Sequence, residues 1–289
     1  MKPLAGNEIK APGQTAVKLA GLPAANGHGF KHRCKRTITR YPVLDLFAGI
    51  CGISVALSAV GIPAESYEVY RSKEENVFRK QCLSSILYRI RNKLVSGIWL
   101  APTCGSWSRA RRGNPDYSGW PPPLRSDALP GIWGLDGLNA ADVLRVKLGN
   151  RTLRLSARIF KAAAAANIPV VLENPRSSRF WVAPPMAALL LNFSCLTFDT
   201  CAFGTEWKKS TLLMYANIDL DPLKRRCLTL NGCGSFTGVP HKLLGGTENN
   251  VFLTATASAY STSFCAAVAR CWRQQVQSKA LDSLSSCLW

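Results

Sequence analysis

The sequence predicts an α/β fold in which helices cover both faces of a mainly parallel β-sheet, with a small inserted lobe. From Tyr41 onward, short apolar runs alternate with helical stretches, which is the pattern of strand–helix–strand units. The chain has 289 residues, 47% of them apolar, so it can bury a large core and is not wholly disordered. In open sheets of this kind ligands bind at the carboxyl ends of the strands, so function is sought in the loops that follow them.

Each strand is predicted from a short apolar run and each helix from a longer stretch with helical periodicity. The predicted strands are Val43–Ala48, Ser66–Tyr70, Gly97–Ala101, Pro169–Glu173, Leu196–Thr200 and Leu212–Tyr215. The predicted helices are Gly52–Val60, Glu74–Lys93, Ala140–Ala166 with a break near Gly149, and Pro185–Asn192. Two segments interrupt the alternation: Trp107–Asn139, too long for an ordinary connection, and Asp219–Val251, the expected lobe.

The net charge indicates the class of binding partner, and the cysteine content indicates the cellular compartment. The chain carries 36 Lys and Arg against 17 Asp and Glu, a net charge of +19, which favours a polyanionic partner, nucleic acid before an anionic membrane. We expect no membrane span and no secretory leader, because the sequence has no apolar run of about 18 residues and no apolar start. The eleven cysteines, an odd number, are typical of reduced thiols in an intracellular protein.

Basic residues gather in two places. Residues 1–41 hold eight Lys or Arg against one acid, Glu8, and are expected to form a flexible basic arm. The arm fits a nucleic-acid contact and equally a leader or targeting segment, so a nuclear and an organellar location both stay open. A basic stripe recurs at helical spacing on the 140–166 helix, where it either contacts phosphates or is an ordinary solvated face. Its members are Lys147, Arg151, Arg154, Arg158 and Lys161, beside an expected apolar face of Leu144, Leu148, Leu155 and Ile159.

The first predicted strand ends in a turn of small residues, Asp45-Leu46-Phe47-Ala48-Gly49-Ile50-Cys51-Gly52, and a helix follows. Glycines let a ligand approach the backbone, and the start of a helix offers free N–H groups. The second strand carries Glu68, an acid placed to accept hydrogen bonds from ribose hydroxyls. The turn and the acid together indicate a nucleoside-bearing cofactor rather than a tight turn beside a surface glutamate.

Two later strand ends carry reactive groups. Cys104 follows Pro102 at the end of the third strand, where a thiolate can act as a nucleophile. Arg109, Arg111 and Arg112 come directly after it and are expected to favour that thiolate. Glu173 follows four apolar residues, so burial should raise its pKa and let it donate a proton to a ring nitrogen. Taken singly, Cys104 also fits an inert thiol and Glu173 a capping or ion-paired carboxylate.

In their order these motifs resemble the cytosine-5 DNA methyltransferases. That family has an FxGxGG cofactor turn, an acid on the second strand, a Pro-Cys loop and a Glu-Asn pair, which appear here as FAGICG, Glu68, PTCGSWS and LENP. The segment FGTEWKKST, at 203–211, is similar to the family's YGxPQxRxR segment, which supports the nucleophile loop and the flipped base. Thr254–Trp272 resembles the C-terminal element that packs back on the cofactor site. The likeness spans Val43–Trp272.

The resemblance implies a Rossmann-like methyltransferase fold and a division of the chain. Residues 42–218 and 252–275 would form the S-adenosylmethionine-dependent domain, with 107–139 as a long active-site loop. Residues 219–251 would be a small target-recognition lobe and 276–289 a tail. The implied activity is transfer of a methyl group from S-adenosylmethionine to carbon 5 of cytosine in DNA, through a covalent cysteine intermediate on a base that has left the duplex.

The resemblance also implies residue roles. Cys104 would attack carbon 6 and Glu173 would stabilise the protonated ring nitrogen 3, with Lys209 of the FGTEWKKST segment beside them. The implied cofactor-binding residues are Asp45, Phe47, Ala48, Gly49, Cys51, Gly52, Glu68 and Pro102. The expected nucleic-acid contacts are Arg109, Arg111, Arg112, Lys147, Arg151, Arg154 and Arg158.

Departures from the family pattern keep two alternatives open. Cys51 stands where the family has glycine, and Thr103, Gly105 and Pro175 replace proline, glutamine and valine. An RNA cytosine-5 methyltransferase and a catalytically silent nucleic-acid-binding relative therefore remain beside the DNA enzyme, which is expected to act as a monomer.

The sequence predicts no metal site. Cys227, Cys233 and His241 lie in the lobe, with Cys195 and Cys201 before it, so a small zinc site stays open as an alternative, but no CxxC pair is present. Packed thiols are therefore the expectation for these residues.

Overall fold

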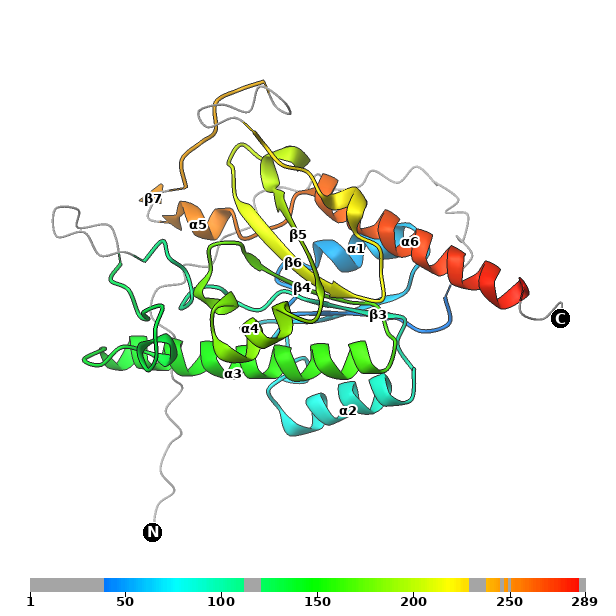
Figure 1. Ribbon diagram of the computed structural model, residues 1–289, viewed down its shortest axis with the longest axis horizontal. Helices are drawn as coiled ribbons and strands as arrows, with labels where there is room; N and C mark the ends of the chain where they lie inside the picture. Colours follow the sequence, from blue (N-terminus) through cyan, green and yellow to red (C-terminus); the bar gives the residue numbers. More distant parts are fainter. Residues whose placement is uncertain (1–38, 112–120, 229–237, 245–246, 249–250, 286–289) are drawn as a thin grey trace, which may run out of the picture. The chain divides into compact units, whose positions relative to one another are not determined.

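One six-stranded sheet organises the computed structural model (Figure 1). The structure describes residues 39–111, 121–228, 238–244, 247–248 and 251–285. The strands are β1 (Val43–Leu46), β2 (Ala64–Tyr67), β3 (Gly97–Leu100), β4 (Val170–Pro175), β5 (Ser194–Asp199) and β6 (Ser210–Ala216). Their order across the sheet is β2-β1-β3-β4-β6-β5, and β6 is antiparallel to both of its neighbours while the other pairs are parallel. The predicted mainly parallel α/β class is confirmed.

Helices cover both faces of the sheet, as predicted (Figure 1). The helices are α1 (Gly52–Ala59), α2 (Lys80–Arg91), α3 (Ala140–Ala165), α4 (Pro184–Leu190), α5 (Leu253–Thr256) and α6 (Thr262–Ser285). Short 3-10 turns are η1 (Gly131–Trp133), η2 (Arg179–Trp181), η3 (Thr200–Phe203) and η4 (Asp221–Leu223), and a small hairpin joins β7 (Thr247–Glu248) to β8 (Val251–Phe252).

The two faces follow from the alternation of side chains along the strands. Leu44 of β1 and Leu100 of β3 point into a core shared with α2, α3 and α4. Trp99, the residue before Leu100 on β3, and Val171 of β4 point to the opposite face, into a second core shared with α1 and α6. Trp272 of α6 packs 6.1 Å from Trp99 between ring centroids, so the C-terminal helix is part of the domain.

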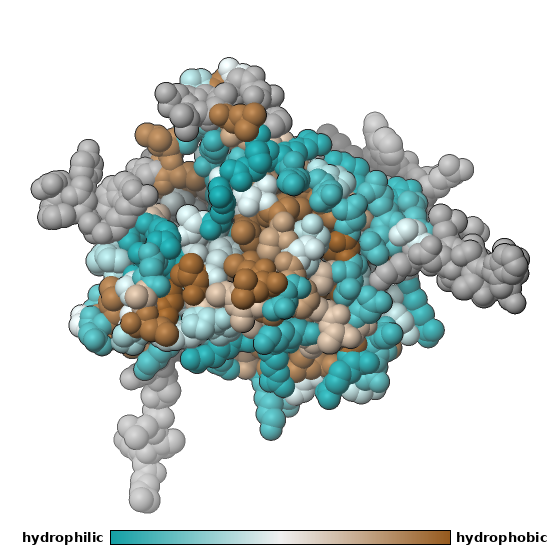
Figure 2. Space-filling view, viewed as in Figure 1, coloured by the Kyte–Doolittle hydropathy of each residue, from teal (hydrophilic) through white to brown (hydrophobic). Residues whose placement is uncertain are grey.

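Helix α3 differs from its prediction in two ways. It is unbroken at Gly149, because that glycine lets the helix lie against Ser106, Trp107 and Arg125, where a Cβ would clash. The expected apolar face is also wrong in its first half, since Leu144 and Leu148 are 64% and 43% exposed. The buried face instead passes through the following residues: Asp142, Val146, Gly149 and Leu153. Figure 2 shows apolar side chains at the surface where α3 begins.

Three other boundaries move. Helix α2 begins at Lys80 rather than Glu74, and α6 continues to Ser285, so most of the expected 276–289 tail is helical. Residues 219–251 belong to the same compact unit as the sheet, Lys35–Trp289, and residues 1–38 of the expected arm lie outside the described residues. Within the part of the chain that the structure describes, no helix has both the length and the apolar character needed to cross a membrane.

Candidate active site

The predicted reactive residues gather at one edge of the sheet. The carboxyl ends of β1, β3 and β4 meet there because these strands are parallel. Strand β6 runs the other way, so its beginning lies at this same edge, with Thr211 paired to Pro175 of β4. Lys209, one residue before β6, is thereby placed beside Glu173 and Cys104, and its charge acts on both.

The cofactor turn after β1 is closed by the predicted acid. The backbone N–H of Gly49 donates to Glu68 Oε2 at 3.0 Å, and the N–H of Tyr70 donates to Oε1 at 3.3 Å. Cys51, where the resemblance expects glycine, has φ of 62°, a left-handed conformation that glycine adopts without strain. A cysteine therefore keeps the backbone shape that the family's glycine would supply.

Asp45 joins β1 to α1 beneath this turn. Its Oδ2 accepts hydrogen bonds from Ser54 Oγ at 2.8 Å and from the Ser54 N–H at 3.3 Å. Burial nevertheless raises the pKa of Asp45 to about 6, because its side chain is only 1% exposed and the charged form loses its hydration. Asp45 therefore supports the turn from the buried side, through Ser54 of α1.

Arg71 is a part of the cofactor turn that the sequence reasoning missed. Its guanidinium pairs with Glu75, donates to the Ser66 carbonyl at 2.8 Å and reaches Cys51 Sγ. The only signal in the sequence is an i, i+4 Arg–Glu pair, which is common on any surface. The guanidinium brings a positive charge to the turn that Glu68 closes.

The nucleophile loop is tied to the Glu-Asn strand end. Asn174 Nδ2 donates to the Pro102 carbonyl at 2.9 Å, across 72 positions of sequence. The Cys104 carbonyl accepts from the Trp107 N–H at 2.9 Å and closes a tight turn. Burial raises the pKa of the Cys104 thiol, Lys209 opposes that shift, and the nearby Glu173 reinforces it.

Glu173 is buried with one oxygen satisfied and one not. Its Oε2 accepts from Tyr260 Oη at 2.9 Å, whereas Oε1 has no hydrogen-bond partner among the described residues. Burial raises the pKa of Glu173, and the Lys209 charge and the Tyr260 hydrogen bond oppose the rise. Tyr260 lies in the 254–272 stretch that was expected to return to the cofactor site, but its contact with Glu173 was not predicted. A protonated Glu173 would have a donor to offer from Oε1.

Hydrogen bonds fix both the side chain and the backbone of Lys209. Its Nζ donates to the Ala257 carbonyl at 3.2 Å. Its N–H donates to Thr200 Oγ1 at 3.1 Å, and its carbonyl accepts from the Thr200 N–H at 3.1 Å. The lysine is therefore fixed at the end of the β5–β6 hairpin.

The arginines after Cys104 have other partners than the thiol. Arg109 pairs with Asp127 and donates to the Ser177 carbonyl at 2.8 Å. Arg111 lies 3.4 Å from Asp142 and donates to the Pro122 carbonyl at 3.0 Å. Arg112 lies outside the described residues. For Arg109 and Arg111 the expectation that they favour the thiolate is therefore corrected: the cation that lowers the pKa of Cys104 is Lys209.

A buried arginine that the sequence reasoning passed over fixes the long loop. Arg125 is 1% exposed, and its guanidinium stacks 3.4 Å from the Trp107 ring centroid. It donates to the carbonyls of Ser106, Ile132 and Val146, to Ser106 Oγ and to Asn150 Oδ1. Burial lowers its pKa to about 9, which leaves it charged at neutral pH. Arg125 thus anchors the backbone two residues beyond Cys104.

The basic stripe on α3 is confirmed as one exposed face. All five of its members are exposed, and Arg151 also donates to the Phe78 carbonyl at 2.7 Å. Arg151, Arg154 and Arg158 line a shallow recess of about 230 Å³ beside Phe78. The stripe therefore offers several guanidinium groups around one hollow.

No family model matches the chain, and no curated protein matches it either. The functional assignment therefore depends on the geometry of the site and on the motifs that it unites.

Proposed function

We propose that this chain is a cytosine-5 methyltransferase that acts on DNA through a covalent bond between Cys104 and the base. One observation carries the proposal: Cys104, Glu173 and Lys209 come from three separate motifs, and their side chains act on one another at a single strand edge. The turn closed by Glu68 follows β1 at the same edge. Reactive sites commonly hold groups whose pKa values are shifted by burial and by one another.

The chemistry divides among these side chains. The Cys104 thiolate forms a bond to carbon 6 of cytosine, which makes carbon 5 nucleophilic. Glu173, whose protonated form burial favours by raising its pKa, donates from Oε1 to ring nitrogen 3 and limits the build-up of charge. After carbon 5 has gained a methyl group it loses its proton, and the bond from sulfur to carbon 6 breaks. Lys209 stabilises the Cys104 thiolate, because its charge lowers the pKa of the thiol.

The cofactor turn fits S-adenosylmethionine, which supplies the electrophilic methyl group when bound. Nothing lies within 4 Å of the place where a Cβ of Gly49 would stand, so a ligand can approach the backbone there. Glu68 keeps lone pairs for ribose hydroxyls, because each of its oxygens accepts only one of the hydrogen bonds described above. Asp45, Phe47 and Pro102 would support the turn and the loop around the cofactor.

The α3 stripe supports a nucleic-acid substrate. Its exposed cations can neutralise backbone phosphates, and the net charge of +19 favours such a partner. Arg158→Gln combined with Lys161→Gln should weaken DNA binding and make its salt dependence shallower. The paired change Lys73→Gln and Lys80→Gln, exposed lysines that are not members of the stripe, should leave both properties as they are in the wild type.

The decisive experiment is covalent trapping. A cytosine with fluorine at carbon 5 cannot lose that substituent after methyl transfer, so an active enzyme stays attached to DNA that carries it. Cys104→Ser should abolish the adduct and Glu173→Gln should slow its formation. Cys82→Ser, on the half-buried thiol of α2, should trap like the wild type.

The alternatives give different outcomes in that experiment. Adducts on RNA but not on DNA would make the chain an RNA methyltransferase. Cofactor binding without an adduct on either substrate would favour a silent relative, a reading supported by the burial that raises the pKa of Cys104. Thr103, Gly105 and Pro175 would then be the first residues to examine.

A further inference from the structure

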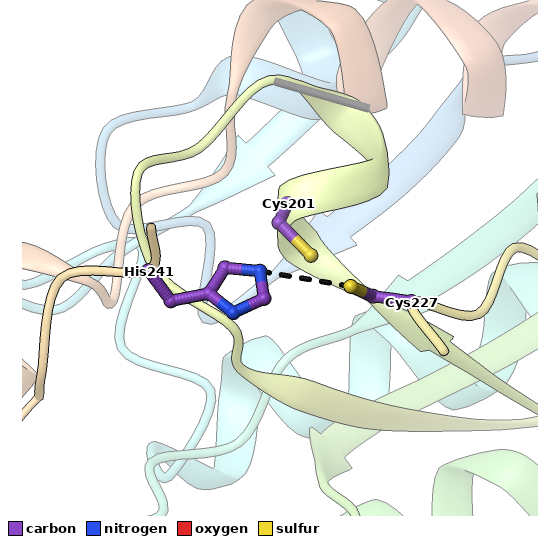
Figure 3. A group of neighbouring side chains, drawn as sticks. All are labelled: Cys201, Cys227 and His241. Carbon is purple, nitrogen blue, oxygen red and sulfur yellow. Dashed lines mark hydrogen bonds between the residues drawn. The ribbon is translucent and has the colours of Figure 1, made fainter. Parts of the chain in front are cut away.

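Two thiols and an imidazole converge beside the β5–β6 hairpin. Cys201 lies in η3, Cys227 follows η4, and His241 comes from the 238–244 segment. Their ligand atoms all lie within 4.8 Å of one another, and Cys227 Sγ is 3.6 Å from His241 Nε2. Figure 3 shows the three side chains pointing toward one another from separate stretches of chain.

Packing alone is a poor explanation for this cluster. Cys201 and Cys227 are both buried, yet they form a small cluster of their own, apart from the two cores of the sheet. Apolar packing would favour aliphatic neighbours for buried thiols, but here an imidazole nitrogen is directed at the sulfur. A polar ring brought to two thiols in a cluster this small suggests a ligand set rather than a core.

We propose that Cys201, Cys227 and His241 bind a structural zinc ion. Zinc bonds of about 2.3 Å to sulfur and about 2.05 Å to nitrogen, at a tetrahedral angle, place the two ligand atoms about 3.6 Å apart, which is the separation observed between Cys227 and His241. Thiolate and imidazole ligands select zinc over magnesium or calcium. Binding releases the two thiol protons to solvent, and the fourth position is left for water or a further ligand.

The surrounding contacts hold the ligand-bearing segments in place. Asp199, at the end of β5, accepts hydrogen bonds from the Cys227 N–H and from Arg226 Nε, each at 2.9 Å. Lys208 Nζ donates to the Cys227 carbonyl at 2.8 Å. On the other side, the Lys242 N–H donates to the Glu206 carbonyl at 2.8 Å, which fixes the residue next to His241. The ligands are therefore presented by segments that are already bound to the hairpin.

Metal binding would reach the proposed active site through the hairpin. Cys201 directly follows Thr200, whose hydroxyl and N–H both bond the backbone of Lys209. A zinc ion that holds Cys201 against Cys227 and His241 would therefore fix the turn that positions Lys209. The metal would act as a positioning element, with no part in the methyl transfer.

The first test is metal content of the full chain. Protein purified without chelators from zinc-supplemented medium should contain about one zinc ion per chain by elemental analysis. After removal of the zinc with a chelator, added Co²⁺ should give the intense visible bands of a tetrahedral site and a near-ultraviolet sulfur-to-cobalt charge-transfer band. Zinc-free wild type, or a weak octahedral cobalt spectrum without the charge-transfer band, would overturn the proposal.

Variants assign the ligands. Cys201→Ser, Cys227→Ser and His241→Ala should each lose most of the zinc, whereas Cys195→Ser, an exposed thiol on β5, should retain it. Full retention by all three variants would place the metal elsewhere and end the proposal. Should a variant fail to fold, the cobalt spectrum of the wild type still decides, because its charge-transfer intensity reports the number of bound thiolates. Zinc content does not depend on methyl transfer, so this test and the trapping experiment can fail separately.

Discussion

The proposed cofactor turn and the proposed reaction cluster lie on the same strand edge but are held by different kinds of group. The cofactor turn, Asp45–Gly52 with Glu68, is held mainly by backbone N–H groups that donate hydrogen bonds to the half-buried carboxylate of Glu68. The reaction cluster, Cys104, Glu173, Lys209 and Tyr260, relies on ionisable side chains whose burial raises the pKa values of the thiol and the acid. A site that binds can be made from main-chain dipoles, whereas a site that reacts must keep groups that exchange protons.

Asp45 connects the two regions. It supports the cofactor turn through Ser54, and its charge also acts on Tyr260, the partner of Glu173. A change at Asp45 should therefore be felt in both regions, while changes at Lys209 and Glu68 should separate them.

The largest expected effect is that of Lys209→Met on the reaction cluster. Removing the one cation that lowers the pKa values of both Cys104 and Glu173 should reduce the thiolate population and slow trapping on fluorocytosine DNA by about 10²–10³-fold. Cofactor affinity should stay within about twofold of the wild type, because the cofactor turn is intact. The measurement is the trapping rate at saturating cofactor.

Lys224→Met is the matched control, since this exposed lysine follows η4 and takes no part in the cluster. It should trap at the wild-type rate. An unchanged rate in Lys209→Met would show that the thiolate forms without this cation and would remove Lys209 from the reaction cluster.

The turn after β1 and its contact with Glu68 could be predicted from the sequence because their signals are local. Asp45 and Gly49 lie at the end of one strand, and Glu68 directly follows the next strand, β2, which ends at Tyr67 rather than at Tyr70, so strand–helix periodicity alone placed them at one edge. The contact between Tyr260 and Glu173 spans 87 positions and has no periodic signal. Sequence resemblance indicated only that the C-terminal stretch returns to the site, without naming the side chain that reaches the acid.

Buried polar anchors were missed for a similar reason. Arg125 is almost fully buried, whereas an arginine in a Gly- and Pro-rich loop is usually exposed. The buried face of α3 passes through Asp142 and Gly149, which are not large apolar residues and give no hydrophobic signal. The hydrophobic pattern therefore predicted a buried face through Leu144 and Leu148, which are exposed. Cys201 and His241 come together although 40 positions separate them, and spacing rules for zinc sites look for closer pairs.

A smaller effect is expected for Glu68→Ala on the cofactor turn. The substitution removes the acceptor for the Gly49 N–H and the proposed ribose partner, so affinity for S-adenosylmethionine should fall by about 10–100-fold. Glu65→Ala is the control, because Glu65 lies on β2 as well but pairs with Arg89 away from the turn. Calorimetry on the folded protein measures both. Equal affinities in wild type and Glu68→Ala would take Glu68 out of the cofactor site.

The last effect concerns Asp45, and it appears as a dependence of stability on pH rather than as a change in binding or trapping. The folded pKa of about 6 lies above the ordinary value of 3.8, so the folded state binds a proton that the unfolded state has released. This contribution to stability is complete below about pH 4 and is lost as the pH rises through 6, at a cost of about 3 kcal/mol by pH 7. Asp45→Asn cannot ionise and keeps an oxygen to accept from Ser54, so its stability relative to the wild type should rise over that interval. Urea denaturation between pH 3 and pH 8 measures the difference.

Glu65→Gln gives this pH experiment its internal contrast. Hydrogen bonds from Arg89 lower the pKa of Glu65, so its contribution is present at neutral pH and is lost only as the pH falls below the ordinary range of a glutamate. Its effect should be small, because Glu65 is about half exposed and an ion pair at the surface is screened by solvent. As the pH rises, the stability of Asp45→Asn relative to the wild type should therefore increase, at pH values above those at which Glu65 titrates. The stability of Glu65→Gln relative to the wild type should instead decrease as the pH rises, in the more acidic range. Parallel stability curves for Asp45→Asn and wild type would mean that Asp45 is hydrated in solution, and the cofactor turn would then lack the buried support that links it to the reaction cluster.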